Sequence, residues 1–176
     1  MITCAMCDDE LPFAEQLRSL VMAYAKKKRV ELQAETFASA EELLEEIENG
    51  AGFEILFLDI EMRKMDGIEL GKKLRELSYQ TLIIYVSGYD QYMRQLFEAE
   101  PFRFLSKPLK QEELENVLDK AFERISRFHR ELFTIRFGKN VVNLLCRDIV
   151  YLESNKRKVI VHTSITISLM RLRKSF

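Results

Sequence analysis

The fold is decided by an apolar run that ends in an acid, FEILFLD at residues 53–59. A second run, TLIIYV at residues 81–86, is just as apolar, and a helical pattern over Ile68–Leu77 separates the two. Strands that are apolar on both sides leave no face for solvent, so they belong in a parallel sheet with helices on both faces. We therefore predict a doubly wound α/β domain in which Asp59 ends the third strand.

Three more strands and the helices between them complete this pattern. The strands are predicted at Ile2–Cys7, Val30–Phe37 and Phe102–Leu105, and the helices at Leu11–Lys28, Ser39–Glu48, Gln91–Glu98 and from Gln111 to about Arg130. Ser39 is the predicted N-cap of the second helix, and Glu42, three residues later, completes a capping box. The result is a five-stranded parallel sheet of flavodoxin-like topology.

The polar residues that could do chemistry all follow predicted strands. Asp8 and Asp9 come after the first strand, Asp59 after the third, Ser87 after the fourth and Lys107 after the fifth. In such sheets the ligand site lies outside the carboxyl ends of the strands. Three converging carboxylates repel one another unless a cation neutralises them, and their hard oxygens favour Mg²⁺ together with water and a phosphate oxygen.

We therefore expect a Mg²⁺ site at this edge, with Asp59 as a nucleophile able to form an aspartyl-phosphate. Lys107 and the Ser87 hydroxyl would stabilise the phosphoryl oxygens. Taken singly, each residue also fits an ordinary role as a turn, a surface charge or a loop hydroxyl. Their joint position at one edge favours the site.

These motifs resemble the receiver domains of two-component response regulators over roughly residues 1–125. The matching stretches are Cys7-Asp8-Asp9-Glu10, Leu58 to Gly67, Val86-Ser87-Gly88 and Phe104 to Pro108. The resemblance implies that Asp59 is the phosphoacceptor and that Ser87 and Lys107 contact the phosphoryl group. It implies a Mg²⁺ ion held by Asp8, Asp9, Asp59 and the backbone carbonyl of Glu61.

Two further residues take a role from the same resemblance. Phe104 matches the aromatic whose rotation couples to Ser87, with a plain core phenylalanine as the competing interpretation, and Pro108 would follow a cis peptide bond. Arg63 stands where the family often has proline. We expect this departure to affect phosphorylated lifetime or partner preference and to leave the chemistry unchanged.

The residues after 125 follow a different pattern. Strand-like segments with no helix between them predict a separate all-β element, at Phe133–Phe137, Val141–Leu145, Ile149–Leu152 and Val159–Val161, with a turn at Gly138-Lys139-Asn140. The boundary is expected near Ser126–Glu131, inside a linking helix.

Residues 1–125 carry a net charge of −9 and residues 126–176 one of +8. This contrast is typical of a cation-binding module followed by a polyanion-binding one; chance clustering of solvated charges is the alternative.

Residues 132–163 resemble the start of a LytTR-type DNA-binding domain, through the stretch Asp148 to His162. That resemblance implies that the loop Ser154–Lys158 enters the major groove, where Asn155 and Arg157 suit base edges and Lys156 and Lys158 suit phosphates. A solvated hairpin tip explains these residues equally well. Beyond His162 the likeness ends, so we predict that 126–176 hold a linker and an incomplete output domain. We expect its tail to be poorly ordered or to pair with another copy, and DNA binding to need the complete protein.

The implied function is a signalling switch. A sensor histidine kinase would donate the phosphoryl group, and homodimerisation would then change affinity for DNA and control transcription. Such a protein catalyses only its own phosphorylation and dephosphorylation. A Mg²⁺-dependent phosphohydrolase with Asp59 as nucleophile and Glu61 as acid is the alternative, although those enzymes usually place the nucleophile after the first strand. A nucleotide-binding module would need a glycine-rich loop after the first strand, which the sequence lacks.

The composition is that of a soluble globular protein, with 47% hydrophobic and 31% charged residues. The N-terminus has no basic region typical of a signal peptide, and no apolar run approaches the ~20 residues that span a membrane. We therefore expect a cytoplasmic protein.

Cys4 and Cys7 have C-x-x-C spacing, but strand positions three apart point to opposite faces. We therefore predict that Cys4 and Cys7 are buried structural cysteines rather than a redox pair or zinc site. The three cysteines, with Cys146, fit a reducing compartment.

Overall fold

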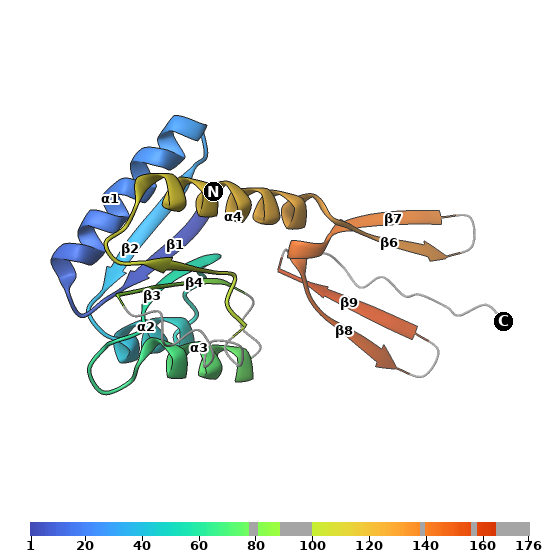
Figure 1. The fold of residues 1–176 in the computed structure, drawn as a ribbon. Helices are drawn as coiled ribbons and strands as arrows, with labels where there is room; N and C mark the ends of the chain where they lie inside the picture. Colours follow the sequence, from blue (N-terminus) through green and yellow to red (C-terminus); the bar gives the residue numbers. More distant parts are fainter. Residues whose placement is uncertain (78–80, 89–99, 138–139, 156–157, 165–176) are drawn as a thin grey trace. The chain divides into compact units, whose positions relative to one another are not determined.

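The computed structural model describes residues 1–77, 81–88, 100–137, 140–155 and 158–164 (Figure 1). The chain forms two compact units, residues 1–121 and 122–176. The helix predicted at Gln91–Glu98 lies outside the described residues.

The first unit is built on a parallel sheet. Its strands are β1 (Ile2–Cys7), β2 (Leu32–Phe37), β3 (Ile55–Asp59), β4 (Leu82–Ser87) and β5 (Arg103–Ser106). They pair in the order β2-β1-β3-β4-β5, and every pair is parallel. The predicted doubly wound, five-stranded sheet is therefore confirmed. β1 and β3 lie side by side where the strand order reverses, which is the point at which such sheets bind ligands.

Helices cover both faces of this sheet, as strands without a solvent face require (Figure 1). They are α1 (Leu11–Lys28), α2 (Ala40–Glu48), α3 (Gly67–Glu76) and α4 (Gln111–Arg130). α2 and α3 lie on one face and bury their apolar residues in one cluster with β1, β3 and β4. α1 and the beginning of α4 lie on the other face (Figure 1). There, Lys27 and Lys28 of α1 pair with Glu115 and Asp119 of α4 at 3.1 and 2.8 Å.

Two side-chain caps start the helices that follow β2 and β3. The Ser39 hydroxyl accepts a hydrogen bond from the Glu42 backbone N–H at 3.2 Å, so the predicted cap is confirmed. The Glu42 carboxylate accepts a hydrogen bond from the backbone N–H of Ala38 at 3.0 Å. A capping box would use the backbone N–H of Ser39 instead, so the predicted capping box is wrong in this detail. Asp66 caps α3 through the N–H of Glu69 at 2.7 Å, a cap that sequence analysis did not single out.

The described residues of the second unit form two antiparallel strand pairs. β6 (Leu132–Phe137) pairs with β7 (Asn140–Leu145), and β8 (Ile149–Asn155) pairs with β9 (Lys158–Thr163). The predicted strands are thus present, and α4 reaches Arg130, so a helix runs through the expected boundary. The functional division at residue 125 remains a prediction.

Two turn predictions in this unit need correction. Asn140 belongs to β7 and pairs with Phe137, while Gly138 and Lys139 lie outside the described residues. The predicted loop Ser154–Lys158 was too long, because Ser154 and Asn155 end β8 and Lys158 begins β9, with Asn155 opposite Lys158. Antiparallel strands can pair up to a two-residue connection, so the ladder takes residues that turn composition alone assigns to the loop.

The cysteines in β1 are structural in position. Cys4 and Cys7 are each 1% exposed, and all three cysteines are free. Burial raises the pKa of the Cys4 thiol far above its ordinary value, which disfavours the thiolate that redox chemistry requires. No helix among the described residues is long and apolar enough to cross a membrane.

Candidate functional site

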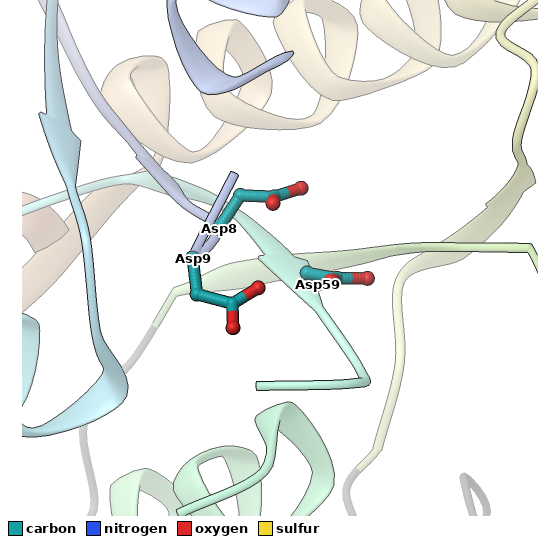
Figure 2. A group of neighbouring side chains, drawn as sticks. All are labelled: Asp8, Asp9 and Asp59. Carbon is teal, nitrogen blue, oxygen red and sulfur yellow. The ribbon is translucent and has the colours of Figure 1, made fainter. Parts of the chain in front are cut away.

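Three carboxylates meet where β1 and β3 end. Cys7 pairs with Leu58 in the sheet, so Asp8 and Asp59 follow neighbouring positions at the same edge. One carboxylate oxygen from each of Asp8, Asp9 and Asp59 lies within 4.8 Å of the others (Figure 2). Asp8 is 3% and Asp59 6% exposed, whereas Asp9 is exposed. The prediction that these residues converge agrees with this geometry.

Lys107 brings the positive charge to the cluster. Its ammonium nitrogen lies 2.9 Å from Asp8 Oδ2 and 3.3 Å from Asp59 Oδ1. The Lys107 backbone N–H donates to the carbonyl of Ser87 at 2.8 Å, which ties the end of β5 to the end of β4. The peptide bond from Lys107 to Pro108 is cis. The Lys107 side chain thus contacts two carboxylates, those of Asp8 and Asp59, that are far from it in the sequence.

The electrostatics of Asp59 follow from this environment. Burial and, after it, the charge of Asp8 raise the pKa of Asp59 to about 6, although Lys107 acts in the opposite direction. Burial by itself would lower the pKa of Lys107, but the hydrogen bonds and charges of Asp8 and Asp59 outweigh it and raise that pKa. Asp59 is thus a carboxylate held in an unfavourable charged state, which a further cation would relieve.

The donor set fits a hard divalent cation. Asp8 and Asp59 are nearly buried carboxylates that share one ammonium, so the negative charge of the cluster exceeds its positive charge at the buried end. Arg63 approaches Asp9 only at 3.7 Å and its side chain is 94% exposed, so it screens the cluster weakly. Oxygen ligands of this kind, few in number and open to water on one side, match the preference of Mg²⁺.

The other predicted residues occupy these positions. Ser87 is buried at the end of β4, one residue past the partner of Asp59 in the sheet. Glu61 lies in the loop after β3, two residues beyond Asp59, with its side chain exposed. Phe104 pairs with Tyr85 and packs, partly buried, against the core cluster, an arrangement compatible with both interpretations of this residue.

The predicted DNA contacts are described only in part. Asn155 ends β8 and Lys158 begins β9, while Lys156 and Arg157 lie outside the described residues. Their roles remain predictions.

Two residues beside the carboxylates were not among the predicted site residues. A Cβ at Gly67 would overlap the backbone carbonyl oxygen of Asp59, so α3 starts against the end of β3 only because residue 67 is glycine. The ring of Phe13, in the first turn of α1, lies with its centroid 4.3 Å from the Lys107 ammonium. An aromatic residue shortly after an acidic pair was the available signal for Phe13. Gly67 ends the stretch Leu58 to Gly67 that carries the family resemblance, but its close approach to Asp59 was not predicted.

Comparison with known proteins shows which family this chain resembles in sequence. The family model for the response regulator receiver domain matches residues 5–119. The chain is 23% identical over 172 residues to the sensory transduction protein LytT of Bacillus subtilis, covering 93% of this chain and 69% of that protein. It is 33% identical over 133 residues to an uncharacterized response regulatory protein of Vibrio cholerae, covering 74% of this chain and 51% of the relative.

A solved structure shows the same fold. The response regulatory domain of protein mrkE from Klebsiella pneumoniae superposes with a TM-score of 0.64 at 18% identity, covering 72% of this chain and 99% of that domain. The shared architecture is the parallel sheet and its helices, and identity at this level carries no more than the fold.

Proposed function

Because the chain belongs to the family of response regulator receiver domains, we propose that it is a phosphorylation switch in which Asp59 accepts a phosphoryl group. The observation that carries the proposal is the position of Asp59, nearly buried at a strand end between Asp8 and the Lys107 ammonium. A buried carboxylate that keeps an adjacent ammonium and a hard-cation ligand set is suited to nucleophilic attack on a phosphoryl group.

The proposed reaction moves one phosphoryl group. A carboxylate oxygen of Asp59 attacks the phosphorus atom and forms a new oxygen–phosphorus bond. The bond from phosphorus to the donor breaks, and its electron pair leaves with the donor, which is a histidine imidazole of a sensor kinase or the acetate of acetyl phosphate. Lys107 donates a hydrogen bond to one phosphoryl oxygen and the Ser87 hydroxyl donates to another.

Asp8, Asp9, Asp59 and the backbone carbonyl of Glu61 would hold the Mg²⁺ ion. When bound, the ion supplies positive charge that balances the phosphoryl oxygens and the carboxylate cluster. Asp8 and Asp9 follow β1, whose end lies directly beside the end of β3, and this position supports the proposed ligand set. In the proposed phosphorylated state Ser87 moves toward the new group, and Phe104 repacks in the space next to it.

Acetyl phosphate tests the proposal without a kinase. Intact-mass spectrometry should find one added phosphoryl group in the presence of Mg²⁺ and none in EDTA. Asp59→Asn should abolish the addition. Glu76→Gln, an exposed carboxylate at the end of α3, is the matched control and should be labelled like the parent. Undiminished labelling of Asp59→Asn would reject the assignment.

The output of the switch is proposed to be transcriptional. The curated relatives are named as sensory transduction proteins LytT and LytR, and the second unit has the strand-rich pattern that resembles a LytTR-type domain. The chain spans 69%, 46% and 47% of the first three relatives it matches. A sensor histidine kinase, homodimerisation on phosphorylation and DNA binding are therefore proposals for the whole protein. Sedimentation that does not change when beryllofluoride and Mg²⁺ are added would contradict dimerisation.

The phosphohydrolase alternative places the same nucleophile in a turnover enzyme. It has less support, because Asp59 ends the third strand of the sheet rather than the first. Release of many product molecules per protein from a phosphate monoester would favour it over the switch.

A further inference from the structure

The Lys107 side chain has a partner that is not a carboxylate. Besides Asp8 and Asp59, its ammonium faces the ring of Phe13, whose centroid is 4.3 Å away. This distance is well inside the range of cation–π attraction, which reaches to about 6 Å. Phe13 is thus a direct neighbour of a group that the proposed chemistry uses.

Local structure fixes the ring at this place. α1 begins at Leu11, directly after the acidic pair, and Pro12 occupies its first turn. The Phe13 backbone N–H donates to the carbonyl of Glu10 at 2.8 Å. The next residue, Ala14, is fully buried and anchors this turn on the sheet. The ring therefore comes from the same short segment as Asp8.

The outer side of the ring is open. Phe13 and Lys107 share an open pocket whose remaining walls are Gln16, Leu20, Pro108 and Leu109. The Lys107 side chain keeps 22% of its surface exposed. The lysine side chain carries its ammonium on a flexible four-carbon stem, and it loses conformational entropy when it is held in one orientation. The contacts around the ammonium decide whether it points at Asp59 or turns toward this pocket.

The carboxylates alone are poor anchors for that orientation. Asp8 and Asp59 both belong to the proposed Mg²⁺ ligand set, so their bonds to Lys107 compete with the ion. The ring of Phe13 has no metal-binding atom, so a bound ion does not compete with the ammonium for this contact. It is the partner of Lys107 whose contact does not depend on what the carboxylates bind.

We infer that Phe13 is a positioning residue that holds the Lys107 ammonium over the edge of the sheet, directed at the phosphoryl group on Asp59. The inference deepens the proposed function and rests on it. Phe13 acts through Lys107 and does not touch the reacting atoms. Loss of a partly exposed cation–π contact of about 0.5–1 kcal/mol corresponds to about a two- to fivefold slower phosphorylation.

The test compares Phe13→Leu, which keeps apolar bulk but loses the ring face, with Phe13→Tyr, which keeps the face. Phosphorylation by acetyl phosphate is followed by intact mass. The mobility of the Lys107 side chain is measured by NMR relaxation of its terminal CH₂ group in metal-free protein. Phe13→Leu should slow phosphorylation and mobilise the lysine terminus, and Phe13→Tyr should restore both. Phe13→Met provides a second ringless variant if the leucine packs poorly.

Lys107→Met supplies the decisive background, because it keeps the stem and removes the charge. There, Phe13→Leu should have no further effect on the phosphorylation rate. An equal slowing in that background would show that the ring acts only through packing and would overturn the inference. An unchanged mobility of Lys107 in Phe13→Leu would overturn it as well. A parent protein that takes up no phosphoryl group would refute the proposed function, while the mobility comparison would still decide whether Phe13 orders the lysine.

Discussion

Asp59→Asn should stabilise the metal-free protein, and the gain should depend on pH. The charged carboxylate of Asp59 is destabilised by burial and by Asp8, which together raise its pKa to about 6. In the unfolded chain the same group has its ordinary pKa of about 3.9. Asparagine resembles the protonated, uncharged acid, so the substitution removes the unfavourable charge from the folded state.

The magnitude follows from the gap between the two pKa values. A gap of about two pH units corresponds to about 3 kcal/mol, at about 1.4 kcal/mol per unit. Because the pKa is higher in the folded state, the folded protein binds the proton more tightly. The contribution of Asp59 to stability is therefore fully present below pH 3.9 or so and is lost as pH rises through about 6. The gain from Asp59→Asn should be about 3 kcal/mol at pH 8 and about half of that at pH 5.

Urea unfolding in EDTA, followed by circular dichroism, measures this difference. Glu76→Gln is the control for loss of an exposed carboxylate, and changes at such positions are usually within about 0.5 kcal/mol. Mg²⁺ should reduce the difference, because an ion that binds only the folded state stabilises the parent more than the variant. An Asp59→Asn gain that is the same at pH 5 and pH 8, or a loss at pH 8, would refute the electrostatic reasoning.

Three other changes test neighbouring parts of the structure. Gly67→Ala should destabilise the protein by about 1–3 kcal/mol in urea unfolding, because its Cβ would overlap the Asp59 carbonyl. Gly52→Ala is the control and should not destabilise the protein, because a Cβ there meets nothing within 4 Å. Equal effects of the two changes would contradict the close approach at Gly67. Tyr85→Phe should cost less than about 0.5 kcal/mol of stability, or should increase stability, because the buried Tyr85 hydroxyl has no hydrogen-bond partner among the described residues. A loss of stability above about 1.5 kcal/mol would reveal such a partner. Asp9→Asn should weaken Mg²⁺ binding in isothermal titration calorimetry about tenfold or more, since it removes one charged oxygen ligand; unchanged affinity would remove Asp9 from the site.

Sequence patterns predict the sheet and its edge well, for a physical reason. Apolar runs such as FEILFLD, separated by helical patterns, suit strands that are covered on both faces, and parallel strands carry their carboxyl ends to one edge. Asp8, Asp59 and Lys107 could therefore be placed at the same edge from their positions after strands. The sequence could not say which carboxylates the ammonium reaches, because this depends on the path of the chain after β5.

The features that could not be predicted from the sequence depend on close packing between segments that are far apart in the chain. Gly67 is constrained by the carbonyl of Asp59 on a different element, and no local pattern reports such an approach. The ends of β8 and β9 were assigned to a loop because polar residues such as Ser154 and Asn155 suit turns. Pairing between the two strands overrides that preference.

The most direct measurement is chemical capture of the acyl phosphate. After treatment with acetyl phosphate and Mg²⁺, borohydride reduces an aspartyl phosphate to homoserine, and peptide mass spectrometry then locates the converted residue. We predict homoserine at position 59 and at no other acid, with none formed in EDTA. Homoserine at Asp8 or Asp9, hydroxynorvaline (the reduction product of a glutamyl phosphate) at Glu61, or no homoserine at position 59 in a protein that has taken up a phosphoryl group would contradict the account.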